Sequence, residues 1–198
     1  KHVWARLDRS LISIQAHEAA ITDVAFAAGT RLVATASEDR TIKLWDARTG
    51  KLLSTLGPLT SVPRFLAFHP DGGLVAAGCD SGVVLVLDRS HRVVASFTDD
   101  QQKDVNRRSS PLAYEEDSEV ATLNRPVLAP AVEFDPTGFQ LAAGFYLGNV
   151  RLWEMPAFRL VADWKAGVTE SNTALAFSPD GASLATGSLF PQAPIRFW

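Results

Sequence analysis

Apolar residues recur along the chain in short runs separated by turn-forming residues, and the first clear set spans residues 17–46. ITDVAF alternates apolar and polar positions, which is typical of a half-buried β-strand. RLVATAS and TIKLWD follow, each after a short turn. Strands this short are not stable alone, so we expect each three-strand set to pack against similar sets.

The same pattern recurs three more times. The phenylalanines that end the first strand of each unit are Phe26, Phe68, Phe134 and Phe177, and their spacings are 42, 66 and 43 residues. Two of the spacings match the ~40–45-residue period of four-stranded propeller blades. Three of the phenylalanines precede the turns HPDG, DPTG and SPDG, in which proline fixes φ and glycine closes the turn. The chain is therefore predicted to be a tandem series of four-stranded units.

The first complete unit resembles the repeat of the WD-repeat β-propeller family. That repeat has a histidine before its first strand, a strand of small residues, an aspartate turn and a Trp-Asp pair, and His17, Thr35, Asp39 and Trp45 stand at these places. The resemblance implies that these four side chains form a buried hydrogen-bond network that is structural and not catalytic. Their donors and acceptors are suited to one another.

The later units depart from this signature. In the second unit the four places are taken by Leu59, Ala77, Ser81 and Leu87. The third unit keeps only Trp153, and the fourth keeps Trp198. We therefore expect the polar network in one blade only, with apolar packing in the others, since a buried network can be lost as a whole at little cost.

The predicted fold is an all-β WD-repeat β-propeller segment over residues 1–198, with about four and a half four-stranded antiparallel blades. We interpret it as a partial propeller, a piece of a larger one. The units are 1–16 (a partial blade ending in LISIQA), 17–56, 57–97, 126–166 and 167–198 (an incomplete blade). A closed four-bladed ring remains an alternative, in which residues 11–15 pair with residues 195–198.

Residues 98–125 break the repeat and are polar and charged, so they are predicted to be an insertion without a core of its own. They read either as a surface loop or as a regulated arm. In the second case, phosphate added at Ser109 or Ser110 would pair with the adjacent Arg107 and Arg108.

Composition limits the classes of function. The chain has 198 residues, of which 46% are hydrophobic, and this is enough for a sizeable core. A net charge of −3 does not favour nucleic acid or an anionic membrane as a partner. The single cysteine, Cys79, rules out an intrachain disulfide and fits a cytoplasmic location. The four histidines lack metal-ligand spacing and no nucleotide or hydrolase motif occurs, so we predict no metal, no cofactor, no small-molecule substrate and no enzymatic activity.

The resemblance implies a scaffold or adaptor module that binds other proteins of a larger complex. Arg40, Arg64 and Arg89 lie in or beside predicted turns, so they are the candidate partner-binding residues. One alternative is a reader of a modified peptide on a propeller face, which would need an arginine cluster or an aromatic cage.

A second alternative rests on one unit. FHPDGGLVAAGCDSGVVLVLD resembles a repeat of the echinoderm microtubule-associated-protein-like family and related axonemal WD-repeat proteins, in which an apolar residue often replaces the tryptophan, as Leu87 does. This resemblance implies a structural component of a microtubule-based complex in the cytoskeleton or cilium, with tubulin or axonemal proteins as partners.

Overall fold

The computed structural model describes residues 12–90, 92–98, 129–145, 148–166, 172–188 and 194–198. These residues form antiparallel sheets, which we call blades A to D, and no helix is present among them. Blade A contains β1 (Ile21–Phe26), β2 (Leu32–Ser37), β3 (Ile42–Asp46) and β4 (Lys51–Leu56). Blade B contains β5 (Pro63–Phe68), β6 (Leu74–Cys79), β7 (Val84–Asp88) and β8 (Val93–Phe97).

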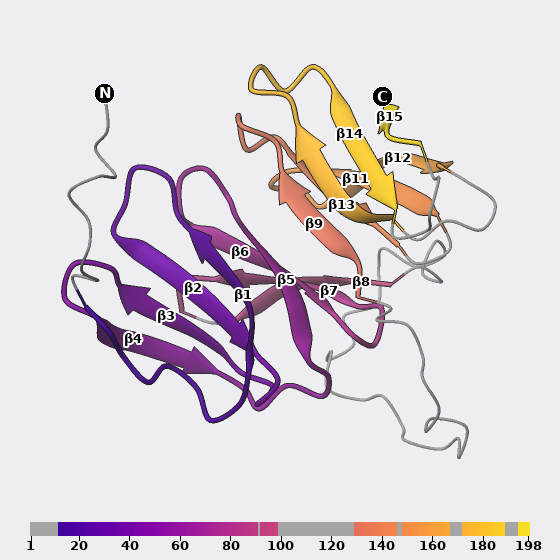
Figure 1. Ribbon diagram of the computed structural model, residues 1–198. Helices are drawn as coiled ribbons and strands as arrows, with labels where there is room; N and C mark the ends of the chain where they lie inside the picture. Colours follow the sequence, from indigo (N-terminus) through magenta and orange to yellow (C-terminus); the bar gives the residue numbers. More distant parts are fainter. Residues whose placement is uncertain (1–11, 91, 99–128, 146–147, 167–171, 189–193) are drawn as a thin grey trace, which may run out of the picture.

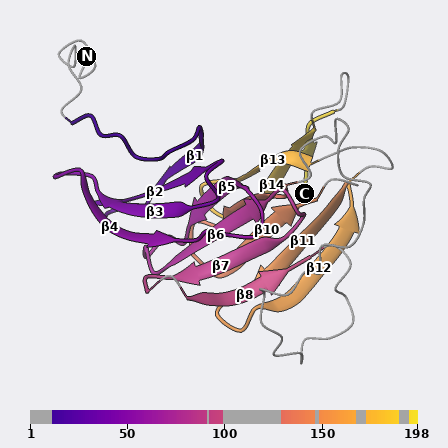
Figure 2. The ribbon, with the colours of Figure 1, turned by 90° about the horizontal axis from the view of Figure 1, so that it is seen from below.

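Blades C and D complete the described structure. Blade C contains β9 (Ala131–Phe134), β10 (Gln140–Gly144), β11 (Asn149–Glu154) and β12 (Arg159–Lys165). Blade D has three described strands, β13 (Asn172–Phe177), β14 (Leu184–Ser188) and β15 (Arg196–Phe197). In every blade, strands that are consecutive in sequence lie side by side (Figure 2).

The blades fan out around their first strands. β1 lies beside β5, β5 beside β9, and β9 beside β13, so these strands are innermost, while β4, β8 and β12 lie at the outer edges (Figure 1). The four sheets therefore form an open arc, which confirms the predicted all-β partial propeller.

The register aligns the repeats as the sequence does. Trp45, Leu87 and Trp153 each pair with a residue near the start of the second strand of the blade, and Trp198 exchanges two backbone hydrogen bonds with Leu184 in the same way. The four residues thus occupy equivalent places in their sheets. Leu87 and Trp153 lie in the clusters that join their blade to the preceding one.

In the B–C and C–D interfaces, a large aromatic side chain from each blade fills the outer part. The Phe97 ring stacks on that of Trp153 with centroids 4.4 Å apart, and Trp164 lies 5.4 Å from Trp198. Trp164 therefore packs between blades C and D, although its buried Nε1 has no hydrogen-bond partner in the described structure.

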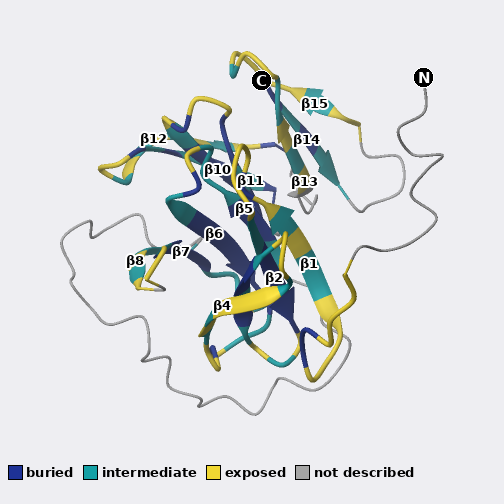
Figure 3. Cartoon of the chain, turned by 90° about the vertical axis from the view of Figure 1, so that its left-hand side faces the viewer, coloured by how far each residue is buried: buried dark blue, intermediate teal, exposed yellow. Residues whose placement is uncertain are grey.

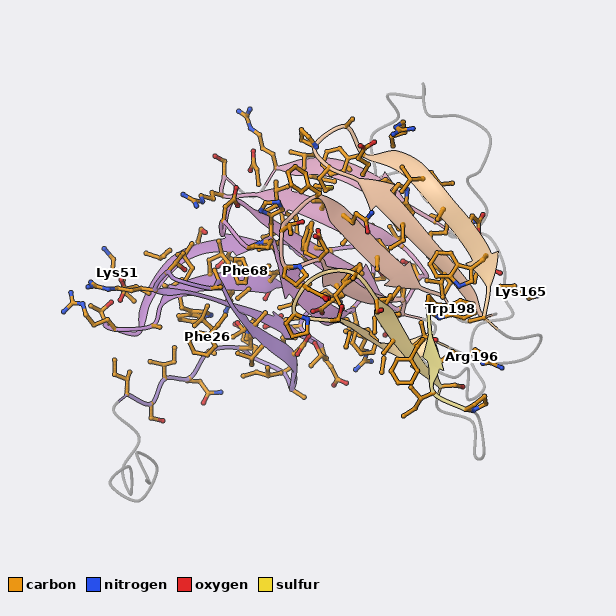
Figure 4. The ribbon with its side chains drawn as sticks, turned by 90° about the horizontal axis from the view of Figure 1, so that it is seen from above. Phe26, Lys51, Phe68, Lys165, Arg196 and Trp198 are labelled. Atoms are coloured by element: carbon orange, nitrogen blue, oxygen red, sulfur yellow. The ribbon has the colours of Figure 1, made fainter. Side chains whose placement is uncertain are left out.

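The face of blade A that points away from blade B is only partly covered, since Thr35 and Trp45 are buried there but the neighbouring apolar side chains are not. Val24 and Phe26 are 49% and 68% exposed there, whereas the equivalent Leu66 and Phe68 of blade B lie in the core between blades A and B. Figure 3 shows yellow and teal on β1 and β4 against dark blue on β6, and Figure 4 labels both phenylalanines. The far face of blade D is also open, since Phe197 is 76% exposed.

Residues 12–16 differ from the prediction of a strand, because none of them belongs to a described ladder. They lie beside blade A, where a Cβ at Gly50 would meet the side chain of Ile12 at 2.8 Å and that of Ile14 at 3.3 Å. This part of LISIQA therefore does not complete blade D, and the described residues give no support to a closed four-bladed ring. Trp4 and the rest of residues 1–11 lie outside the described residues.

Gly78, in β6, lies very close to the segment that leads into blade C. A Cβ at this position would stand 1.8 Å from the carbonyl oxygen of Pro130, just before β9. The equivalent Gly187 of blade D is different, because its nearest neighbour would be the Cβ of Ala174 at 3.6 Å. Only glycine fits at Gly78 without separating the two sheets.

We expect Gly78→Ala to destabilise the fold by at least about 2 kcal/mol, because backbone must move away from backbone in a packed interface. The matched control is Gly187→Ala, which we expect to be neutral or to stabilise by about 0.5 kcal/mol, since alanine restricts the unfolded chain. Urea unfolding of both variants measures the difference. Equal effects would contradict the close approach of β6 to Pro130.

Candidate functional site

The structure brings together the four signature residues of blade A. The indole Nε1 of Trp45 donates to Oγ1 of Thr35 at 2.9 Å. The same Thr35 oxygen lies 2.6 Å from Nε2 of His17, and Nδ1 of His17 lies 2.9 Å from Oδ2 of Asp39. His17, Thr35 and Trp45 are buried. Four residues that are separated in the sequence are therefore linked by one continuous series of hydrogen bonds.

The chemistry of its two ends assigns the direction of this chain. An indole N–H can only donate and an ionised carboxylate can only accept. Thr35 therefore accepts from Trp45 and donates to Nε2 of His17, and His17 donates from Nδ1 to Asp39. With a neutral imidazole, the N–H and O–H groups of Trp45, Thr35 and His17 all donate within the network. The arrangement therefore fits a structural role and leaves none of these side chains free to act as a nucleophile or base.

Asp39 is held by further hydrogen bonds. Its partial burial by itself raises the pKa, but the net pKa is well below the usual value. The reason is that Asp39 accepts hydrogen bonds from the Thr41 hydroxyl, from His17 and from the backbone N–H groups of Thr41 and Glu18. Asp39 therefore fixes the β2–β3 turn and the segment before β1 to each other.

The expectation that polar bonding is confined to one blade is wrong in part. In blade D, Nε1 of Trp198 donates to Oγ1 of Thr186 at 3.2 Å, and this reproduces the Trp45–Thr35 bond. In the alignment of the repeats, Thr186 is the residue equivalent to Thr35. In blade B the place of His17 is taken by Leu59, whose side chain is buried as predicted for apolar packing.

A second recurrent feature was missed in the sequence. Two residues before the tryptophan, Lys43 donates from Nζ to the Ala16 carbonyl at 2.8 Å, and Arg151 donates from Nη1 to the Thr98 carbonyl at 2.8 Å. Arg151 also pairs with Asp163. Each cation holds the chain segment outside its own sheet: Lys43 the segment before β1, and Arg151 the residue that follows β8 of blade B. The signal in the sequence was the motif Lys/Arg-x-Trp, which recurs at 43–45, 151–153 and 196–198.

The three candidate partner-binding arginines lie in different surroundings. Arg64 bridges two blades, since it pairs with Asp80 of blade B and with Glu38 of blade A. Arg89 donates to the backbone carbonyls of Gly72 and Asp71, within its own blade. The structure does not bring the three together.

Arg40 differs from the other two. Its side chain is exposed and makes no hydrogen bond or ion pair with a described residue. Its backbone φ is +64°, in the left-handed region, and the same turn position carries Gly82 at +80° and Gly148 at +83° in blades B and C. Arginine at such a position is strained where glycine is not.

His69, the first residue of the HPDG turn of blade B, contacts the next blade. Nε2 of His69 lies 3.0 Å from the carbonyl oxygen of Gly138 in the next blade, and its ring packs edge-on against Phe134. Its other nitrogen, Nδ1, lies 2.7 Å from Asp71. The HPDG turn therefore links blades B and C, which sequence neighbours alone could not reveal.

Other candidates carry no chemistry in the described structure. Burial raises the pKa of Cys79 to about 12, so the thiol is unreactive at neutral pH. No group of three His, Cys, Asp or Glu side chains among the described residues could hold a metal ion. Within the same residues, no helix is long and apolar enough to cross a membrane. Ser109 and Ser110 lie outside the described residues.

We expect Thr35→Val to destabilise the protein by about 1–3 kcal/mol, because it leaves the buried Trp45 N–H and His17 nitrogen without partners. Adding Trp45→Phe to Thr35→Val removes the unpaired N–H of Trp45. The double variant should therefore lose less free energy of unfolding than the two single variants together. Urea unfolding gives the coupling, and exposed Thr55→Ala is the control. Simple additivity would contradict the network.

The low pKa of Asp39 predicts a pH dependence. A carboxylate whose pKa is lower in the folded state stabilises the fold above its unfolded pKa, and this contribution is lost as the pH falls toward the folded pKa. Asp39→Asn should therefore be less stable than the wild type at pH 7, and the gap should narrow below about pH 4. Urea midpoints at pH 7, 5 and 3 test this, with exposed Glu18→Gln as the control. A gap that does not vary with pH would count against it.

The comparisons with known proteins agree with this geometry. Residues 8–46 and 50–88 match the WD40 family, described as WD domain, G-beta repeat. The chain is 25% identical over 191 residues to autophagy-related protein 16 of Arabidopsis thaliana, covering 87% of this chain and 37% of that protein. It is 33% identical over 90 residues to eukaryotic translation initiation factor 3 subunit I of Aspergillus fumigatus, covering 43% of this chain and 26% of that protein.

A third similarity is to the U3 small nucleolar RNA-associated protein 21 homolog of Schizosaccharomyces pombe, with 25% identity over 168 residues, 85% of this chain and 16% of that protein. The chain thus spans between 16% and 37% of the length of these relatives. None of the three names refers to an axoneme or a microtubule, so they give no support to the axonemal resemblance. Residues 8–46 and 50–88 thus match WD40 repeats, and the described sheets have the arrangement of blades in a partial β-propeller.

Proposed function

We propose that the chain is a non-catalytic scaffold that binds other proteins through the turns at the ends of its blades. The observation that carries this proposal is Arg40, an exposed arginine in a strained backbone conformation on the β2–β3 turn. A strained backbone conformation that does not stabilise the fold is typical of residues with a functional role.

The surroundings of Arg40 favour a binding role. Asp39, next to it, is fully engaged with His17 and Thr41, and the Arg40 carbonyl accepts a hydrogen bond from Leu59 N–H at 2.8 Å. The turn is therefore held rigid on both sides while the guanidinium stays in solvent. Because the backbone of this turn is already ordered, only the Arg40 side chain loses conformational entropy when it meets a partner.

Contacts between the blades make the platform stiff. Oδ2 of Asp23 accepts from Leu66 N–H at 2.7 Å, and Arg64 joins Glu38 to Asp80. These bonds hold blade A against blade B, so a partner that spans both blades meets turns at fixed spacing. Arg64 and Arg89 remain proposed partner contacts at the edges of this surface.

The names of the relatives support membership of a larger assembly without identifying it. They refer to a subunit of a translation initiation factor, an autophagy-related protein and a small nucleolar RNA-associated protein. We extend to this chain only the general role of a protein-binding module, located in the cytoplasm. A microtubule-based complex and a reader of modified peptides remain narrower hypotheses, and no described contact favours either.

The test is Arg40→Gly. We expect this variant to gain about 0.5–1 kcal/mol of stability, because glycine adopts positive φ without strain. It should at the same time lose bound proteins in quantitative affinity capture from cell extract with the full chain as bait. The control is Arg48→Ala, which removes an exposed arginine at the opposite end of blade A. Identical capture by the wild type and Arg40→Gly would overturn the proposed role of this turn.

A further inference from the structure

Three of the four innermost strands carry alanine immediately before their last phenylalanine, and the fourth carries glutamate. The equivalent residues are Ala25, Ala67, Glu133 and Ala176. The alanine that three repeats share serves the fold that they have in common. The glutamate that replaces it in blade C therefore needs a separate explanation.

The register shows where Glu133 faces. It lies directly opposite Ala142 of β10, so the two side chains share one face of blade C. Ala142 belongs to the cluster that joins blade C to Leu184 of blade D, whereas Val132 and Phe134 belong to the cluster with blade B. Glu133 therefore points toward blade D, at the inner edge of the seam where β9 lies beside β13 (Figure 1).

Among the described residues, the carboxylate of Glu133 has no partner in this seam. It is half-buried, and no described residue forms a hydrogen bond or an ion pair with it. Its burial raises its pKa above the ordinary value. At the same position blade B has Ala67, which is only 8% exposed. An unpaired, partly desolvated carboxylate weakens the interface that alanine would fill.

We propose that Glu133 is a binding point for an arginine or lysine side chain of a partner polypeptide that enters from the inner side of the arc between blades C and D. This inference rests on the proposed scaffold function and specifies the chemistry of one contact. A carboxylate binds a guanidinium through two parallel hydrogen bonds, and a partly water-excluded site strengthens such a pair. A metal ion is not favoured, because no metal-binding group of acids is found among the described residues.

The test uses the full chain and fluorescent Gly/Ser peptides that differ only in three central residues, which are arginine, lysine, alanine or glutamate. We expect the wild type to bind the arginine and lysine peptides, as measured by anisotropy. Glu133→Ala should weaken this binding by about 10- to 100-fold. The matched control is Glu18→Ala, which removes the same charge from an exposed loop of blade A and should leave binding unchanged.

A second readout separates loss of binding from loss of folding. Alanine is the residue of three equivalent strands, so Glu133→Ala should fold and raise the melting temperature by about 2–4 °C at pH 7. The gain should shrink at acid pH, where the raised pKa leaves the wild-type group neutral.

Each result decides the proposal. If the wild type does not bind the basic peptides, or if Glu133→Ala binds them equally, the site is refuted. The scaffold function is judged separately by the Arg40→Gly capture experiment, so either proposal can fail alone.

Discussion

Close packing of neighbouring sheets through small residues is the constraint on which the rest of the structure depends. The second strand of each complete blade places alanines at the centre of the interface, and Ala34, Ala76 and Ala142 are fully buried. Small side chains let the inner parts of the sheets approach, while large side chains such as the Phe97–Trp153 pair fill the wider outer part. The wedge shape of each interface turns a stack of sheets into an arc.

Polar contacts then fix the blades relative to one another. Asp23 reaches the backbone of blade B, Arg64 joins acids of blades A and B, and His69 reaches the backbone of blade C. The Asp23 bond lies along the innermost strands, whereas the Arg64 and His69 bonds involve residues of the turns. They orient the turns, so the same contacts that hold the arc together also give the turn surfaces a defined geometry for partners.

Deviations from the repeat are informative because the repeat supplies its own reference. A residue that differs in one blade without loss of stability needs no explanation. A residue that differs and destabilises the fold is expected to have a function of its own. Arg40 is strained where Gly82 and Gly148 are relaxed, and Glu133 is charged where Ala67 is apolar. We expect both changes to lower stability, and we therefore propose that each makes a contact outside the described structure.

The sequence alone determined the strands, the turns and the equivalence of Trp45 with Trp153, because these depend on alternation and spacing within some forty residues. Its resemblance to the WD repeat also pointed to the four members of the blade A network. Only the tertiary structure decided that His69 bonds to blade C, that Trp198 keeps a threonine partner and that Glu133 faces a seam without one. The reason is physical: contacts between blades depend on how whole sheets pack, and no local pattern encodes which side chain stands across the interface.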